Sequence, residues 1–348
     1  MHRPSLALTM IVRNEARCLA RCLQSAQRLV DEILICDTGS TDETVSLATQ
    51  FGARVSHVPW SGDFSQARNH CLDQSQADWN LVLDADEWVD PAVNAEAFRQ
   101  FIQYNPASLG LVRIRSAFRI EERTEYAESW LPRLLPKGIR YLGRIHEQPD
   151  HKLTRSRTDV LVHHDGYEPE RARAKAPRNI ELLLAELAHD RHSPYLHYQL
   201  GVQHDAASEW HQACLSYQRA LACGAGKFTF AHSLGVRLLH ALCRTAQYPQ
   251  ALAWGRHMER QWPRSSDVFF AVGNLCLDLA NAEPEFALDT WLPSAQAAWL
   301  RCLEIGEEHA EQDEHVVGRG SFLAAHNLQV VRDALSHLTL PVGASQLR

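Results

Sequence analysis

The stretch Asn80-Leu81-Val82-Leu83-Asp84-Ala85-Asp86-Glu87 is decisive, because an apolar run that predicts a buried strand ends in two carboxylates one residue apart. Carboxylate oxygens suit Mg²⁺ or Mn²⁺. Proteins usually supply only part of the coordination shell of these ions, and substrate phosphates complete it. The pattern therefore predicts a divalent-metal site that acts on a diphosphate. An exposed acidic turn after a core strand is the alternative.

A second acidic turn lies upstream, where the apolar run at 32–36 leads into Asp37-Thr38-Gly39-Ser40-Thr41-Asp42. The residues after Gly39 predict a helix with Ser40 or Thr41 as its N-cap. In open α/β sheets, ligands collect outside the carboxyl ends of the strands. We therefore expect the two acidic turns to border one pocket.

Strand and helix patterns alternate over the first quarter of the chain. The pattern predicts strands at 6–12, 32–36, 54–58 and 79–83, and helices at 16–29, 41–51 and 65–74. Such alternation predicts an α/β fold, a mostly parallel sheet flanked by helices. No G-x-G-x-x-G follows the first strand, which argues against a dinucleotide cofactor of the Rossmann type. Residues 109–164 predict mixed strands and loops that close the site.

Helical patterns continue from Gly166 to about Leu335, so we expect an α/β domain at 1–170 and an all-α domain at 171–340. Within the helical part, glycines recur after an apolar residue at positions 201, 235 and 273. Their spacing is similar to the period of about 34 in tetratricopeptide repeats. Such arrays usually present a groove to a partner. A plain helical bundle is the alternative.

The composition is that of an ordinary globular protein of 348 residues, and the net charge of -7 argues against a broad basic surface for nucleic acid. The nine cysteines form no C-x-x-C pair, which is typical of free buried thiols in a reducing cytoplasm. The start of the chain has too short an apolar run for a signal peptide, and no apolar window is long enough to span a membrane. We expect a cytoplasmic protein, with peripheral attachment to the inner membrane left open.

Six short motifs follow one another along the chain. They are Met10-Ile11-Val12-Arg13-Asn14-Glu15, Asp37-Thr38-Gly39-Ser40-Thr41-Asp42, Asp63-Phe64-Ser65-Gln66-Ala67-Arg68-Asn69, Asp84-Ala85-Asp86-Glu87, Arg144-Ile145-His146-Glu147 and His163-His164-Asp165-Gly166-Tyr167. In this order and spacing the set resembles inverting family 2 glycosyltransferases of the GT-A fold, specifically bacterial members with a C-terminal tetratricopeptide extension. The resemblance covers residues 5 to about 330. It implies transfer of a sugar from a nucleotide donor, commonly a UDP-sugar, with Mg²⁺ or Mn²⁺ on the diphosphate.

The resemblance also implies roles for individual residues. Asp37 would contact the base, Asp84 would lie near the ribose, and Asp86 would bind the metal directly. Arg133 is a candidate for contact with the diphosphate, with a structural ion pair as the alternative. The residues expected around the donor are Val12, Glu15, Asp37, Arg68, Asp84 and Arg133.

Sugar transfer needs a stabilised leaving group and a group that accepts a proton. A metal held by Asp86 would act as a Lewis acid on the departing diphosphate. The attacking acceptor must lose a proton to a general base, for which Glu147 is the first candidate and Asp165 the second. Either His163 or His164 is a candidate for a further metal ligand, since imidazole accepts Mn²⁺. In the alternative, one histidine packs in a strand and the other is solvated.

Three other functions compete with sugar transfer. Asp37-Thr38-Gly39-Ser40 is also the signature of aspartic proteases, but their fold is all-β and the motif here leads into a helix. A phosphatase of the haloacid dehalogenase type would place Gly and Thr where Glu87-Trp88 stand. A non-catalytic tetratricopeptide-repeat interaction protein with a degenerate transferase domain stays open. So does the acceptor, either a protein or peptide side chain or a surface glycan, and the helical part could instead form a homodimer.

Overall fold

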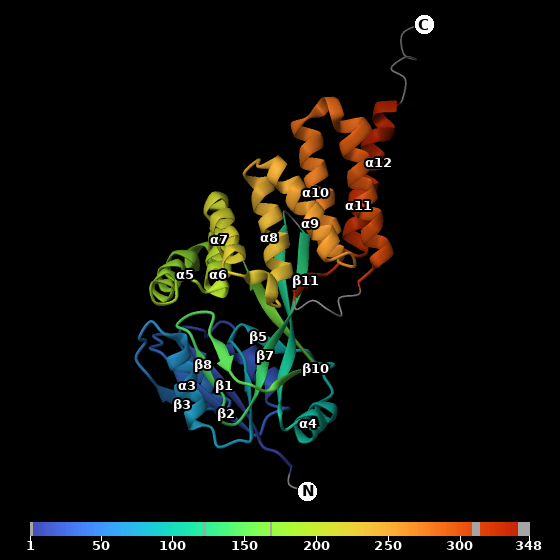
Figure 1. Cartoon of the computed structure of the whole chain (residues 1–348). Coiled ribbons are helices and arrows are strands. Elements are labelled where there is room, and N and C mark those ends of the chain that lie inside the picture. Colours follow the sequence, from blue (N-terminus) through green and yellow to red (C-terminus); the bar gives the residue numbers. More distant parts are fainter. Residues whose placement is uncertain (1–2, 121–122, 168, 308–313, 340–348) are drawn as a thin grey trace. The chain divides into compact units, whose positions relative to one another are not determined.

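The computed structural model describes residues 3–120, 123–167, 169–307 and 314–339 (Figure 1). The chain divides into two compact units, Met1–Ala207 and Ser208–Arg348. The division lies beyond the position near residue 170 that the sequence suggested, because helices α5 (Pro169–His189) and α6 (Pro194–Ala206) belong to the first unit. Their leucines share a buried cluster with Ile145, which explains this placement.

The first unit is built on a mixed sheet whose strands run in the order β3-β2-β1-β4-β7-β6-β10-β5. The four strands from β3 to β4 are parallel to one another, and antiparallel pairing begins between β4 and β7. The strands are β1 (Leu6–Val12), β2 (Glu32–Asp37), β3 (Arg54–His57), β4 (Trp79–Val82), β5 (Glu87–Val89), β6 (Ser108–Ile120), β7 (Arg123–Pro136) and β10 (Thr154–Tyr167), with β8 (Arg140–Leu142) and β9 (Gln148–Asp150) in a separate pair.

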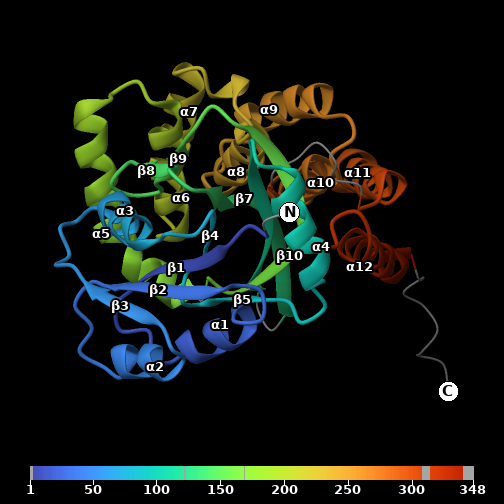
Figure 2. The same ribbon diagram turned by 90° about the horizontal axis from the view of Figure 1, so that it is seen from below.

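Helices cover both faces of the parallel part of this sheet. Figure 2 shows α1 (Leu19–Ala26) and α2 (Thr44–Gln50) on one side of β1 to β3 and α3 (Phe64–Gln74) on the other. Strand β1 is buried on both faces, since Leu8 joins the large core under α1 whereas Ala7 packs with Cys71 of α3. Helix α4 (Ala95–Tyr104) contributes Phe98 and Ile102 to the large core. The arrangement confirms the expected α/β fold.

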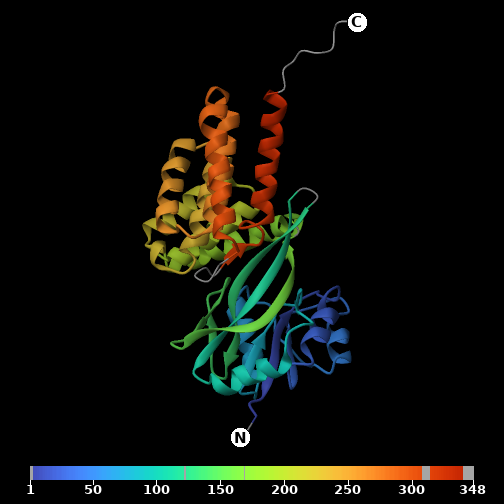
Figure 3. The same cartoon turned by 90° about the vertical axis from the view of Figure 1, so that its right-hand side faces the viewer.

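The long strands β6, β7 and β10 lie side by side and extend the sheet beyond its parallel part (Figure 3). Strand β10 runs parallel to β6, and its later residues pair with β5 in the antiparallel sense. Because β5 follows directly after the second acidic turn, this pairing brings residues 162–164 beside the Asp84–Glu87 motif. The register therefore connects two motifs that lie far apart in the sequence.

One local prediction is wrong. Helix α2 begins at Thr44, so neither Ser40 nor Thr41 is its N-cap. The backbone N–H of Ser40 instead donates to the carboxylate of Asp37, and the N–H of Thr44 donates to Asp42 Oδ1. A hydroxyl cap at Thr41 would have bound the N–H of Thr44, and Asp42 takes that N–H instead.

The second unit is helical. Its helices are α7 (Trp210–Ala222), α8 (Ala231–Arg244), α9 (Tyr248–Gln261), α10 (Ser266–Ala282), α11 (Leu292–Ile305) and α12 (Phe322–Thr339), with short turns at Ala225–Lys227, Pro284–Phe286 and Ala287–Trp291 and a short strand β11 (Glu314–Val316). A side chain at Gly235 would collide with Met258, and one at Gly273 would collide with Trp299. The glycines at 235 and 273 therefore mark close contacts between helices.

All nine cysteines are free thiols, and seven of them are buried. This confirms the prediction of unpaired cysteines. None of the helices in the described ranges is long and apolar enough to cross a bilayer.

Candidate active site

Asp37 ends β2 and is 3% exposed. Its carboxylate accepts hydrogen bonds from the backbone N–H groups of Gly39 and Ser40, each at 3.1 Å, and lies 3.2 Å from His57 Nδ1. Burial raises the pKa of Asp37, but the bonds from Ser40, Gly39 and His57 outweigh burial and hold the pKa below its ordinary value. Asp37 is therefore a fixed anion at the edge of the sheet.

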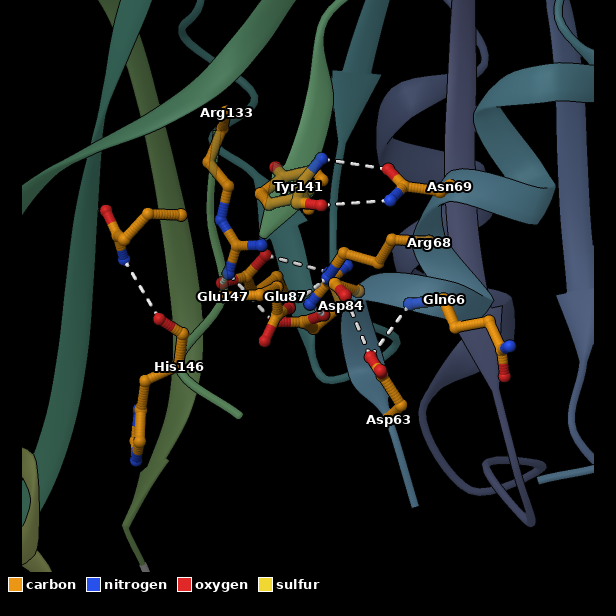
Figure 4. A network of polar contacts seen from close by, with 12 residues as sticks. Asp63, Gln66, Arg68, Asn69, Asp84, Glu87, Arg133, Tyr141, His146 and Glu147 are labelled. Carbon is orange, nitrogen blue, oxygen red and sulfur yellow. Dashed lines mark hydrogen bonds and ion pairs between the residues drawn. The ribbon is translucent and has the colours of Figure 1, made fainter. Parts of the chain in front are cut away.

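Asp84 lies in a network of two arginines and three carboxylates (Figure 4). Arg68 Nη2 donates to Asp84 Oδ1 at 2.8 Å, while Arg68 Nε donates to Glu147 Oε1. Arg133 Nη2 donates to Asp84 Oδ2 and to Glu87 Oε1, both at 2.8 Å. The network joins the end of β4 to α3 and β7 at the Asp84 carboxylate, and Arg68 links it further to the loop after β8.

The electrostatics of the network keep Asp84 and Arg133 charged. Burial favours the neutral form of Asp84, but the guanidinium groups of Arg133 and Arg68 overcome it and hold the pKa of Asp84 well below its usual range. The pKa of Arg133 is raised, because Asp84 and Glu87 outweigh the effect of burial on its charge. The ion pair expected as an alternative role for Arg133 is present in the structure.

Asp86 lies beside His164, with 3.5 Å between Asp86 Oδ2 and His164 Nε2. Both side chains are partly exposed, and Ser116 Oγ lies 3.1 Å from His164 Nδ1. Burial raises the pKa of Asp86, but the hydrogen bond and charge of His164 lower it below its ordinary value. Burial lowers the pKa of His164, but Asp86 raises it overall. The pair therefore combines an ionised oxygen donor with a ring nitrogen.

His163 points away from this pair, because neighbouring residues of a strand face opposite sides of the sheet. Its Nε2 lies 2.6 Å from Asp90 Oδ2, and its ring stacks on Trp88 with 5.3 Å between the centroids. Of the two histidines proposed as metal ligands, the structure brings His164 and not His163 to Asp86.

The donor set at Asp86 and His164 fits a divalent cation. Oxygen and imidazole nitrogen together suit Mn²⁺, and Mg²⁺ takes few protein ligands when phosphates complete its shell. No group of three or more His, Cys, Asp or Glu side chains suited to a metal occurs among the residues that the structure describes. Asp86 and His164 would supply two ligands, with the other positions left to substrate and water.

Val12 is the last residue of β1, and Glu15 lies three residues after it. The N–H of Glu15 donates to Thr44 Oγ1 at 2.7 Å, and burial, together with the charge of Asp86, raises the pKa of its carboxyl. Val12 is buried, and its carbonyl accepts hydrogen bonds from the N–H and hydroxyl of Thr38. Glu15 is thus a carboxyl close to Asp86, whereas Val12 contributes backbone to the turn.

The two candidates for the general base both contact arginines. Arg68 engages Oε1 of Glu147, whose side chain is 9% exposed. Asp165 forms ion pairs with Arg17 at 3.3 Å and with Arg21 at 2.5 Å. Its backbone N–H also donates to the carbonyl of Asp86. Glu147 therefore belongs to the Asp84 network, whereas Asp165 lies on the side of Asp86.

Sequence reasoning missed two members of the site. Glu87 binds Arg133 and accepts from the N–H of Asp84 at 2.9 Å, and its position three residues after Asp84 was an available signal. Tyr141 is buried with its ring 5.6 Å from the Arg68 guanidinium, and Asn69 bonds to its backbone N–H and carbonyl. Burial raises the pKa of Tyr141 to about 12. No local pattern marks Tyr141, because its partners are distant in the sequence.

The chain resembles known proteins in sequence. The sequence profile described as Glycosyl transferase family 2 matches residues 8–164. A TPR repeat-containing protein of Synechococcus elongatus is 35% identical over 56% of this chain and 51% of its own length, so the matched segment spans about half of that relative. The SPbeta prophage-derived glycosyltransferase SunS of Bacillus subtilis is 26% identical over 80% of this chain and 68% of its own length.

A solved structure of lower similarity is glucosyl-3-phosphoglycerate synthase from Mycobacterium tuberculosis in complex with Mn²⁺, UDP and glucosyl-3-phosphoglycerate. It is 22% identical, covers 33% of this chain and 44% of that chain, and has a TM-score of 0.26, which is too low to transfer any feature of its site. The resemblance to this family rests on the profile match and the two relatives. Residues 8–164 thus resemble glycosyl transferase family 2, and a helical part similar to tetratricopeptide repeats follows.

Proposed function

We propose that this protein transfers a sugar from a nucleotide-diphosphate donor, a UDP-sugar, to an acceptor, with inversion at the anomeric carbon and with Mn²⁺ or Mg²⁺ as cofactor. The observation that carries the proposal is the pair of Asp86 and His164 beside the arginine-bound Asp84, at the carboxyl end of β4. Ligands of α/β sheets bind at this edge. The match of residues 8–164 to glycosyl transferase family 2 supports sugar transfer.

The donor would lie along the ends of β1, β2 and β4. Asp37 is a fixed anion suited to hydrogen-bond donors of the base, and Asp84 is held in place for the ribose by two guanidinium groups. Arg68 and Arg133 already neutralise Asp84, so the site does not add an unpaired negative charge next to the donor phosphates. Asp86 and His164 would hold the cation. When bound, the cation stabilises the negative charge that develops on the leaving diphosphate.

Glu147 is the proposed general base. In an inverting transfer, the acceptor attacks the anomeric carbon from the face opposite the diphosphate, the new bond forms, and the C–O bond to the diphosphate breaks with its electron pair. The acceptor proton would pass to Glu147, where Arg68 engages one carboxylate oxygen and keeps the group oriented. Asp165 is the second candidate, since its carboxylate is bound by two arginines rather than one.

The proposed acceptor is a protein or peptide side chain, because helical repeats commonly bind extended or helical peptides. A surface glycan is the competing outcome of an acceptor screen. We also propose that the protein acts in the cytoplasm and binds no nucleic acid, in line with its net charge of -7. A homodimer through the helical part is a separate proposal, which sedimentation analysis of the full chain tests.

The experiment that tests the proposal is a calorimetric and thermal-shift comparison of UDP, GDP, CDP and TDP, each with and without Mn²⁺. We expect UDP to stabilise the protein in a metal-dependent manner, because a ligand that binds only the folded state raises its stability. Transfer would then be measured with UDP-sugars and peptide acceptors. Absence of metal-linked binding by every nucleotide would overturn the proposal in favour of a non-catalytic repeat protein.

A further inference from the structure

Glu147 reaches Arg68 from a tight loop, here called the catalytic loop and defined as residues 143–147. Two of its residues have positive φ angles, Gly143 at 97° and His146 at 51°. Glycine adopts such angles readily, whereas a non-glycine residue there is strained. Contacts from outside the loop must therefore hold His146 in this conformation.

The middle of the catalytic loop is fixed by residues of α3, α5 and α6. The N–H of Phe64 donates to the carbonyl of Arg144 at 2.8 Å. Ile145 is 4% exposed and packs in one cluster with Leu183 of α5 and Leu200 of α6. Helices that begin the helical half of the sequence thus contact the loop that bears the proposed base.

His146 itself is bound at two points by α6. The hydroxyl of Tyr195 donates to the carbonyl of His146 at 3.3 Å, and Gln203 Nε2 lies 3.3 Å from His146 Nε2. Asn179 of α5 donates to Gln203 Oε1 at 3.0 Å, so that the amide nitrogen of Gln203 faces the imidazole. An amide nitrogen can only donate, so His146 Nε2 accepts and the ring proton resides on Nδ1. Burial lowers the pKa of His146 to about 4, which agrees with a neutral ring.

We propose that Gln203 and Tyr195 are positioning residues of the transferase reaction, because they hold His146 in its left-handed conformation and thereby direct Glu147 toward Arg68 and the acceptor. The inference rests on the proposed function and deepens it. Asn179 acts one step further away by fixing the amide of Gln203. The hairpin of α5 and α6 is in this sense a part of the catalytic machinery and not only the start of the repeat array.

The kinetic test uses Tyr195→Phe, which removes one hydroxyl, and Gln203→Leu, each in the full chain. We expect kcat for transfer to fall about tenfold, in line with the loss of orientation of a catalytic group. The KM for the UDP-sugar and the metal-dependent binding of UDP stay unchanged, because the donor contacts lie elsewhere. The matched controls are Tyr104→Phe and Gln212→Leu, two exposed positions at which kcat stays unchanged.

A double-variant cycle separates positioning from general packing. If Gln203 acts through His146, then Gln203→Leu has little further effect on kcat in a His146→Asn background, because the two effects are coupled. Additive losses would show that Gln203 acts by another route and would overturn the proposal. Should Gln203→Leu fail to fold, the kcat of Tyr195→Phe against that of Tyr104→Phe decides the question, because Tyr195 donates to the backbone carbonyl of His146 and the variant removes this contact.

Nitrogen-detected NMR of the His146 imidazole provides a readout that needs no activity. We expect a neutral ring with its proton on Nδ1 near pH 6, and a mixture of tautomers in Gln203→Leu. The opposite tautomer in the wild-type protein would overturn the proposal. A wild-type protein that shows this ring but binds no nucleotide would overturn the proposed function and the positioning role with it. An active enzyme whose variants keep wild-type kcat would overturn the positioning role alone.

Discussion

Two regions of the site bring carboxylates into place by different means. After β2, Asp37 is oriented by backbone N–H groups two and three residues away. In the catalytic loop, Glu147 is held by Arg68, 79 positions distant, and the loop itself by Tyr195 and Gln203 of α6. The first arrangement is local and the second is tertiary. Asp37, Asp84 and Asp86, which lie at or just after the ends of β2 and β4, are here called the strand-end region. The activity should therefore be sensitive to changes of charge in the strand-end region. In the catalytic loop it should also be sensitive to changes in the packing of distant residues.

The largest expected effect belongs to the strand-end region. Asp86→Asn keeps the volume of the side chain and removes the charge that pairs with His164. We expect transfer to fall about a thousandfold, since the loss of a charge-stabilising group at a leaving group has this order of effect. Metal-dependent stabilisation by UDP should vanish with it. Asp159→Asn, an exposed change on β10, serves as the control. Metal-dependent UDP binding that persists in Asp86→Asn would remove Asp86 from the metal site.

The corresponding change in the catalytic loop is Glu147→Gln. We expect transfer to fall about a hundredfold, because removal of a general base typically costs this much or more. Binding of UDP with Mn²⁺, measured by calorimetry, should be retained, so that the two regions separate into cation binding and proton transfer. The exposed change Glu181→Gln on α5 is the control. Near-normal turnover would transfer the role of base to Asp165.

Arg133→Met tests how much the ion pairs at Asp84 contribute to the stability of the fold, since Arg133 connects Asp84 and Glu87. Loss of one partner from a buried ion pair leaves uncompensated charge, but the side chain of Asp84 is 37% exposed and partly solvated. We therefore expect the free energy of unfolding, measured with urea, to fall by about 2 kcal/mol. The double variant Arg133→Met/Glu87→Gln should recover part of this loss. Arg155→Met, an exposed change, is the control. An equal loss of unfolding free energy in Arg133→Met and Arg155→Met would contradict a specific network.

The smallest expected effect concerns a helix cap. Asp63 Oδ1 accepts from the N–H of Gln66 at the start of α3, the helix that carries Arg68. Asp63→Ala should lower the free energy of unfolding by about 1 kcal/mol and also reduce turnover. Asn94→Ala removes the cap of α4 and should cost similar stability with turnover unchanged. Equal turnover in the two variants would show that the position of Arg68 does not depend on the cap.

Much of the strand-end region could be predicted from the sequence. The apolar runs before Asp37 and Asp84 predict buried strands, and both runs are buried in the sheet. The prediction that His163 or His164 joins Asp86 needed one further fact, the pairing of β10 with β5, which places His164 opposite Glu87. Sequence cannot supply that register, because a shift by one residue would exchange the two histidines between the faces of the sheet.

The tertiary contacts were beyond reach of sequence patterns for the same reason. Tyr141 and Gln203 carry no local signal, since each acts through residues more than fifty positions away. The boundary after Ala207 was displaced from its expected position because α5 and α6 look like the start of the helical half but bury their leucines against the catalytic loop. Helical periodicity reports that a face is apolar and not which surface covers it.

By itself, the sequence determined the alternation of strands and helices, the two acidic turns and the order of motifs, because strand period, turn chemistry and helix period are properties of neighbouring residues. The tertiary structure alone decided that Arg68 and Arg133 share Asp84, that His164 rather than His163 faces Asp86, and that α6 holds the catalytic loop. Those outcomes depend on strand register and on the packing of distant helices, where many weak contacts act together and no single segment carries the information.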